Sequence, residues 1–155
     1  MRLGESLTWR WVRGEAVDAR VLGNPFIPNG TNYRLCVYDA SLSPQPRVDA
    51  LARAGGTCRV GNPCWLPFGT RGAIDYANFL PGSPPDGLSQ IRLKPSPEGR
   101  GKMLLRGRGA LLPQGFLPFT PPVVAQLVSD SGACWEATYS TPLLNDGTRF
   151  RARVD

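Results

Sequence analysis

The sequence contains no histidine, and this absence excludes several common chemistries. Without an imidazole there is no Ser-His-Asp or Cys-His nucleophile, no imidazole metal ligand and no imidazole proton shuttle. Acidic residues are also few, 12 of 155, and no recognisable motif holds two of them. The chain has neither a GxSxG elbow nor an SxxK pair. The sequence therefore predicts a protein that is not an enzyme and that binds no cofactor and no metal.

Long apolar runs are missing as well. No window approaches the roughly 20 apolar residues that a membrane-spanning helix needs. The opening stretch MRLGESLTWRWVRG lacks the apolar segment of a signal peptide. We therefore expect no membrane span, in a protein that is either intracellular or the excised mature region of an exported chain.

Lysine is scarce although the chain is basic. The net charge is +6, and all 18 basic residues except Lys94 and Lys102 are arginines, spread from Arg2 to Arg153. Binding to nucleic acid depends on Lys and Arg contacts to phosphate, which usually come from a clustered basic segment. Because no such segment is present, the sequence disfavours a nucleic-acid partner.

What the chain has in excess is turn formers. Its 18 glycines and 16 prolines are about a fifth of all residues, above the roughly 12% of average usage. Between the turns, short runs alternate apolar and polar residues with a period of two, which is typical of half-buried strands. Such runs are found at residues 7–11, 33–40, 88–94, 102–109, 133–140 and 149–154, and a nearly continuous apolar run at 122–129 predicts an interior strand.

Three details sharpen this prediction. Leu7, Trp9 and Trp11 share one face of the first run. Residues 46–56 fit either a helix of about two turns or an irregular edge strand. Asp146-Gly147 predicts a tight hairpin turn with positive φ angles, followed by a strictly alternating strand.

The pattern predicts an all-β fold. About 8 strands with at most one short helix favour a single domain over residues 1–155, a two-sheet antiparallel β-sandwich of jelly-roll or immunoglobulin-like type.

The four cysteines predict disulfides. Zinc sites usually contain C-x2-C pairs, and none is present here. An even number of cysteines in a turn-rich chain favours an oxidising compartment, although a metal site and free buried thiols remain alternatives. The turn-forming RVGNP segment can bring Cys58 and Cys64 together, and Cys36 and Cys134 each lie within a strand, so we expect the pairs 58–64 and 36–134.

Aromatic residues are the candidates for ligand binding. Trp65 and Trp135 each follow a cysteine, and with Tyr38 and Tyr139 they form a possible platform for stacking on sugar rings. The alternative is that these tryptophans pack in the core against disulfides. Aspartates at strand ends offer a calcium alternative, although each is explained more simply as a turn former; they are Asp39, Asp86, Asp130 and Asp146.

The order of motifs resembles that of uncharacterised disulfide-containing β-sandwich modules in predicted secreted bacterial proteins. The motifs are GESLTWRW, YRLCVYD, AGGTCRVGNPCW, PDGLSQIRLKP, GKMLLRGRGALL, VVAQLVSDSGACWEATY and RFRAR. The resemblance covers nearly the whole chain and implies an extracytoplasmic β-sandwich module without an established activity.

The leading prediction is therefore a non-catalytic structural, adhesive or assembly module, extracellular or periplasmic, stabilised by two disulfides. Its expected partners are other protein subunits or surface glycans. The alternatives are a carbohydrate-binding module that uses exposed Trp and Tyr side chains, and a hydrolase built on carboxylates such as Asp39 and Glu136.

Overall fold

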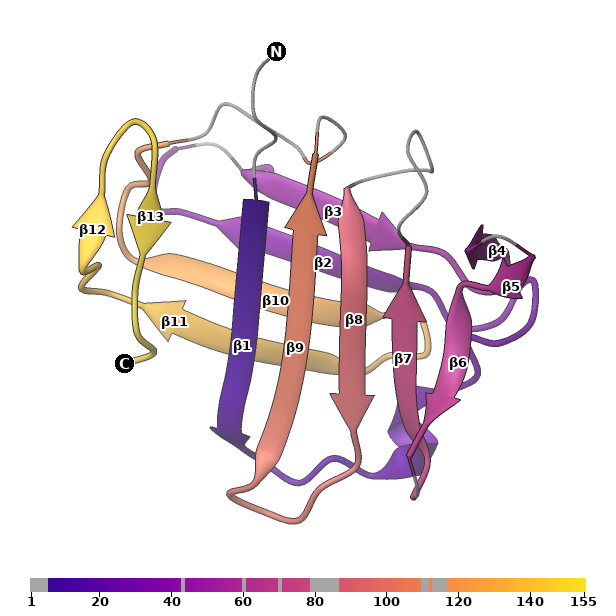
Figure 1. Cartoon of the computed structure of the whole chain (residues 1–155). Coiled ribbons are helices and arrows are strands. Elements are labelled where there is room, and N and C mark those ends of the chain that lie inside the picture. Colours follow the sequence, from indigo (N-terminus) through magenta and orange to yellow (C-terminus); the bar gives the residue numbers. More distant parts are fainter. Residues whose placement is uncertain are drawn as a thin grey trace.

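The polypeptide forms two large antiparallel β-sheets that lie one behind the other (Figure 1). A computed structural model describes residues 6–42, 44–59, 61–69, 71–78, 87–109, 112 and 117–155. The first sheet has the order β1-β9-β8-β7-β6, with β1 Ser6–Gly14, β9 Gly101–Arg108, β8 Leu88–Lys94, β7 Ala73–Ala77 and β6 Trp65–Phe68. The second has the order β11-β10-β2-β3, with β11 Cys134–Tyr139, β10 Val123–Ser129, β2 Tyr33–Tyr38 and β3 Val48–Ala52.

Two smaller pairs of strands lie outside these sheets. They are β4 Thr57–Arg59 with β5 Asn62–Pro63, and β12 Leu144–Asn145 with β13 Phe150–Arg151. Nine strands in the large sheets and four in the small pairs exceed the predicted number of about eight in the described residues. A 3-10 turn, η1 Ala19–Leu22, begins where the Asp18 side chain accepts a hydrogen bond from the amide of Arg20.

Alternation decides which face of each strand is buried. Trp9 and Trp11 lie inside while Thr8 and Arg10 are exposed, as predicted for the first run. In β8, Ile91 and Leu93 are inside in the same way. Strands β2 and β10 both occupy central positions, as predicted, but β10 alternates between buried and partly exposed residues because its second face is the outer face of the sheet.

One prediction about local structure is decided and another needs correction. Of the two alternatives for residues 46–56, the edge strand is confirmed: their middle part is β3, and they contain no helix. The C-terminal turn is shifted by one residue, since Asp146 and Arg149 flank it and Gly147 has no positive φ. The Asp146 carboxylate accepts hydrogen bonds from the amides of Thr148 and Arg149, and this side-chain turn replaces the predicted Asp-Gly turn.

The strands of the two sheets run crosswise (Figure 1), and their inner faces form one hydrophobic core. At the edge where β1 approaches β11, two tryptophans connect the sheets. Trp9 Nε1 donates to the Tyr139 hydroxyl over 2.8 Å, and Trp11 Nε1 donates to the carbonyl of Glu136 over 3.0 Å. These bonds satisfy buried indole N–H groups and fix how the sheets are placed against each other.

Glycine is required where the Trp11 ring crosses the backbone. A Cβ atom on Gly14 would lie 2.0 Å from Cη2 of Trp11, and one on Gly101 would lie 2.5 Å from Cζ3 of the same ring. Both glycines pair in the β1–β9 ladder, at an irregularity between Val12 and Gly14. The ladder therefore leaves room for the indole that reaches the second sheet.

The Trp9–Tyr139 bond can be tested by a double-mutant cycle. We expect Tyr139→Phe to lower the free energy of unfolding by about 1–3 kcal/mol, because it leaves a buried indole N–H without an acceptor. Trp9→Phe should cost a similar amount, and the double variant should cost clearly less than the sum of the two. Urea unfolding of the four proteins measures this, and additive effects would show that the bond does not couple the sheets.

Candidate functional site

A disulfide between Cys58 and Cys64 closes a short segment of chain beside the five-stranded sheet. Cys58 of β4 is bonded to Cys64, with their Cα atoms 4.6 Å apart, so the predicted pairing of these two cysteines is confirmed. The backbone of Cys64 makes two hydrogen bonds. Its amide donates to the carbonyl of Gly56, and its carbonyl accepts from the amide of Ala77. The turn is thereby attached to β7.

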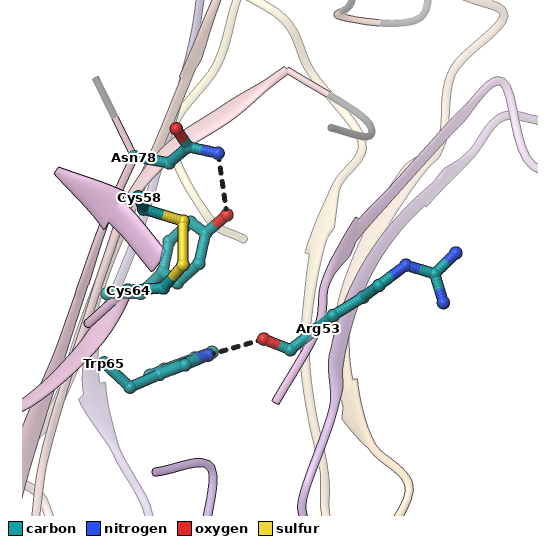
Figure 2. The surroundings of a disulfide bond; sticks show 6 residues. Arg53, Cys58, Cys64, Trp65 and Asn78 are labelled. Atoms are coloured by element: carbon teal, nitrogen blue, oxygen red, sulfur yellow. Dashed lines mark hydrogen bonds between the residues drawn. A yellow bond between two sulfur atoms is a disulfide. The ribbon is translucent and has the colours of Figure 1, made fainter. Parts of the chain in front are cut away.

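Trp65, the residue after the turn, points into the molecule. Its side chain is 2% exposed, and its Nε1 donates to the carbonyl of Arg53 over 2.7 Å (Figure 2). The indole lies between the rings of Tyr33 and Tyr76, with centroid distances of 5.4 and 4.9 Å. Because Arg53 directly follows β3, Trp65 connects β6 to the four-stranded sheet.

The tyrosine hydroxyls around Trp65 also have partners. The Tyr33 hydroxyl donates to the carbonyl of Leu22, and the Tyr76 hydroxyl accepts from the side-chain amide of Asn78 over 3.2 Å (Figure 2). Burial raises the pKa of the Tyr33 phenol, with a smaller contribution from Asp130. This cluster is a packed, hydrogen-bonded part of the core, so the disulfide turn stabilises the fold and presents no binding surface through Trp65.

The predicted bond between Cys36 and Cys134 is wrong. Both are free cysteines, and β10 lies between their strands, with Cys36 opposite Gln126 and Cys134 opposite Val128. Neighbouring strands are about 4.8 Å apart, so two strand spacings exceed the reach of a disulfide. The mid-strand position was predicted correctly for Cys36, whereas Cys134 is the first residue of β11, and the sequence did not indicate the strand that separates them.

Neither thiol is activated. Burial raises the pKa of Cys36, and burial followed by the charge of Glu136 raises the pKa of Cys134. A raised pKa lowers the thiolate fraction at neutral pH, and the thiolate is the reactive species. The two cysteines therefore lack the environment of a catalytic or redox-active pair.

The predicted aromatic platform does not form as a surface. Trp65, Trp135 and Tyr139 are buried, and of the four proposed residues only Tyr38 is partly exposed. The inward positions follow from strand alternation, because Trp135 and Tyr139 pair with Leu127 and Val123 on the inner face of the four-stranded sheet. Buried rings cannot stack on a glycan, so these four residues form no exposed binding site.

The two carboxylates proposed for hydrolysis have structural partners. The side chain of Asp39 is 1% exposed; it accepts from Ser41 and from the amide of Thr120 over 2.9 Å, with Arg47 Nε at 3.6 Å. Glu136 accepts from Gln126 Nε2 over 2.6 Å on the outer face of the four-stranded sheet. Asp39 is thus a buried loop-fixing group and not an acid that faces an open cleft.

No calcium site is found in the part of the chain that the structure describes, where no three His, Cys, Asp or Glu side chains gather. The Asp130 carboxylate accepts hydrogen bonds from the backbone and side-chain amides of Asn32. The Asp146 carboxylate accepts from the amide of Thr148 in the C-terminal turn, as expected of turn formers. Asp86 lies outside the described residues.

A concentration of positive charge on one outer face is the feature that the sequence analysis missed. We call it the basic face, and it is made of Arg10 on β1, Arg92 and Lys94 on β8, and Lys102, Arg106 and Arg108 on β9. These residues come from three separate segments of the sequence but belong to adjacent strands (Figure 1). Strand alternation predicts that each one points outward; the missing information was the pairing of β1 with β9.

Comparison of the chain with protein-family models, curated proteins and solved structures finds no match. The resemblance to secreted bacterial modules stays a prediction. Among the described residues, no helix has the length and apolar character to span a membrane.

Asp39 should make the protein sensitive to acid. Although burial opposes it, hydrogen bonds from Ser41 and Thr120 hold the pKa of this carboxyl below its usual value. A lowered folded-state pKa gives stability above the unfolded-state pKa, near 4, which is lost as the pH falls through the folded value. We expect Asp39→Asn to cost about 1–2 kcal/mol at pH 7 and to flatten the loss of stability in acid.

The matched control for this experiment is Asp49→Asn, which removes the same charge from an exposed pair with Arg34. It should change stability at pH 7 by less than about 1 kcal/mol. Urea unfolding between pH 7 and pH 2.5 compares the three proteins. An Asp39→Asn variant that follows the wild-type pH dependence would exclude this role of Asp39.

Proposed function

We propose that the protein is a non-catalytic extracytoplasmic module with a structural or adhesive role. The observation that carries the proposal is the Cys58–Cys64 bond, because disulfides persist in extracellular and periplasmic compartments and are rare in the cytosol. The bond closes a short turn beside Trp65, and in the chain-entropy model a loop of this length contributes about 2 kcal/mol.

The disposition of the polar side chains supports a non-catalytic role. Asp39, Asp130 and Asp146 each fix a loop through backbone amides, and three indoles connect the sheets or the segments that follow them. Groups used in this way are held by the fold and are not available to a substrate. The positions of these carboxylates and indoles are therefore explained by their contribution to the stability of the fold.

We further infer that the two packed sheets form a β-sandwich that is neither a jelly roll nor immunoglobulin-like. The strands β6 to β9 follow one another in a single sheet as a meander. Jelly-roll and immunoglobulin-like sandwiches are built on Greek-key connections, in which consecutive strands are exchanged between sheets more often. The shared feature is the pair of antiparallel sheets around one core.

The compartment can be tested by counting thiols. Protein recovered from its native compartment and unfolded without reductant should show two free thiols, Cys36 and Cys134, and four after reduction. A Cys58→Ala/Cys64→Ala variant is the control and should show two under both conditions. Four free thiols before reduction would overturn the extracytoplasmic assignment, and none would show that Cys36 and Cys134 are oxidised in the native protein.

A further inference from the structure

We propose that the basic face binds an acidic polysaccharide, a chain whose sugars carry carboxylate or sulfate groups. The inference deepens the adhesive role and rests on it. It starts from the charge on the outer face of the five-stranded sheet, which carries six cations. Asp75 is the only acidic residue in the five described strands of this sheet. Asp75 is itself bonded to Arg92 over 3.1 Å.

The second large sheet shows the opposite balance. Its four described strands contain one cation, Arg34, and two carboxylates, Asp49 and Glu136. Of the two large sheets, the five-stranded one is therefore the one whose described strands carry an excess of positive charge. An asymmetric field of this kind attracts and orients a polyanion.

The register of β8 and β9 increases the local charge. Lys94 is directly opposite Lys102, and the next outward pairs along the same two strands are Arg92 with Leu104 and Gln90 with Arg106. The ammonium of Lys94 lies over the Phe68 ring of β6, 5.0 Å from its centroid, so it extends away from Lys102 and widens the basic face toward β6.

A hollow of about 400 Å³ adjoins these cations. It lies over β1, β9 and β8, and its lining residues include Ser6, Thr8, Gln90, Arg106 and Arg108. Hydroxyl and amide groups can bond to sugar hydroxyls, while arginine binds carboxylate or sulfate through two parallel hydrogen bonds. The hollow thus offers both kinds of contact that an acidic sugar needs.

The spacing of the cations fits an extended chain. Adjacent strands are about 4.8 Å apart, and outward residues along one strand are about 7 Å apart. Both are of the scale of one sugar unit. The cations are staggered between the strands, with Arg10 and Arg92 in one row, Lys102 and Lys94 in the next and Arg106 in a third, so a chain lying across the face can contact several of them.

Other polyanions fit the face less well. Proteins that bind single-stranded nucleic acid use exposed aromatic rings for base stacking, whereas Phe68, the aromatic residue on this outer face, lies 4.1 Å below the guanidinium of Arg92. A duplex is usually entered by a helix or a two-stranded ribbon, and the basic face is a broad sheet. A membrane surface requires a contiguous apolar area, and Val12 is the exposed large apolar side chain in the described strands of this sheet.

The test measures the affinity of the full chain for labelled polygalacturonate, with neutral dextran as the reference polymer. The face variant is Arg10→Gln/Lys102→Gln/Arg106→Gln/Arg108→Gln. The control variant has the same net charge but changes residues off the basic face: Arg34→Gln/Arg53→Gln/Arg151→Gln/Arg153→Gln. Circular dichroism and thermal unfolding verify that both variants are folded.

We expect polygalacturonate to bind the unmodified protein and dextran not to bind. The face variant should lose affinity by about tenfold or more and show a weaker salt dependence, while the control variant should lose less than about threefold. Equal losses in the two variants would mean that net charge alone drives the affinity, and would overturn the proposal. Tighter binding of duplex DNA or of phosphatidylglycerol vesicles at matched charge concentration would replace the polysaccharide by that polyanion and equally overturn it.

A single substitution separates binding from folding. Lys102 is exposed on β9, so Lys102→Gln should leave the melting temperature unchanged while lowering polygalacturonate affinity by about two- to fivefold. A purely structural lysine would give a lower melting temperature instead, which contradicts the inference. The thiol count is independent of these measurements: failure here with two free thiols overturns the polysaccharide partner alone, and binding with four free thiols overturns only the compartment.

Discussion

The architecture depends on indole N–H groups that cross between the two sheets. Sheets that run crosswise share a compact core but diverge at their edges, where the interior must still be closed. Trp9 and Trp11 close the edge between β1 and β11, and Trp65 closes the edge between β6 and the end of β3. Each indole fills much volume and has one donor to satisfy, so its bond fixes direction as well as distance. The glycines beneath Trp11 and the disulfide turn before Trp65 are the local adjustments that allow these rings to reach across.

Because the indoles and the inner apolar residues supply the cohesion, the outer faces are free to differ in chemistry. On the four-stranded sheet, Arg34 pairs with Asp49 and Glu136 with Gln126, so the polar groups largely satisfy one another. The described strands of the five-stranded sheet carry six outward cations and one carboxylate, Asp75. These cations lie on the outer face, so the imbalance of charge does not disturb the apolar core.

The sequence allowed the strands to be predicted better than their partners. Period-two alternation located the strands around Trp9, Leu35, Ile91 and Trp135, because alternation is a local property. It also placed Trp9 and Ile91 on buried faces, whereas Trp135 was assigned to a possible surface platform and is buried. Strand order depends on contacts distant in sequence. The pairing of β1 with β9 created the basic face, and the insertion of β10 between β2 and β11 separated Cys36 from Cys134. Neither event leaves a local signal, which explains why a scattered set of arginines gave no indication of a charged surface.

The Cys58–Cys64 turn shows how a short covalent link can matter beyond its own loop. Its entropy contribution is modest because the loop is short. Its position is more important, since Trp65 follows the bond directly and begins β6, the last strand of the five-stranded sheet. Fixing the chain at Cys64 limits where the indole can start, and the bond to the Arg53 carbonyl then determines where the sheet edge lies. The basic face lies on β1, β9 and β8 of the same sheet, so the turn and Trp65 fix the opposite edge of the sheet that carries it.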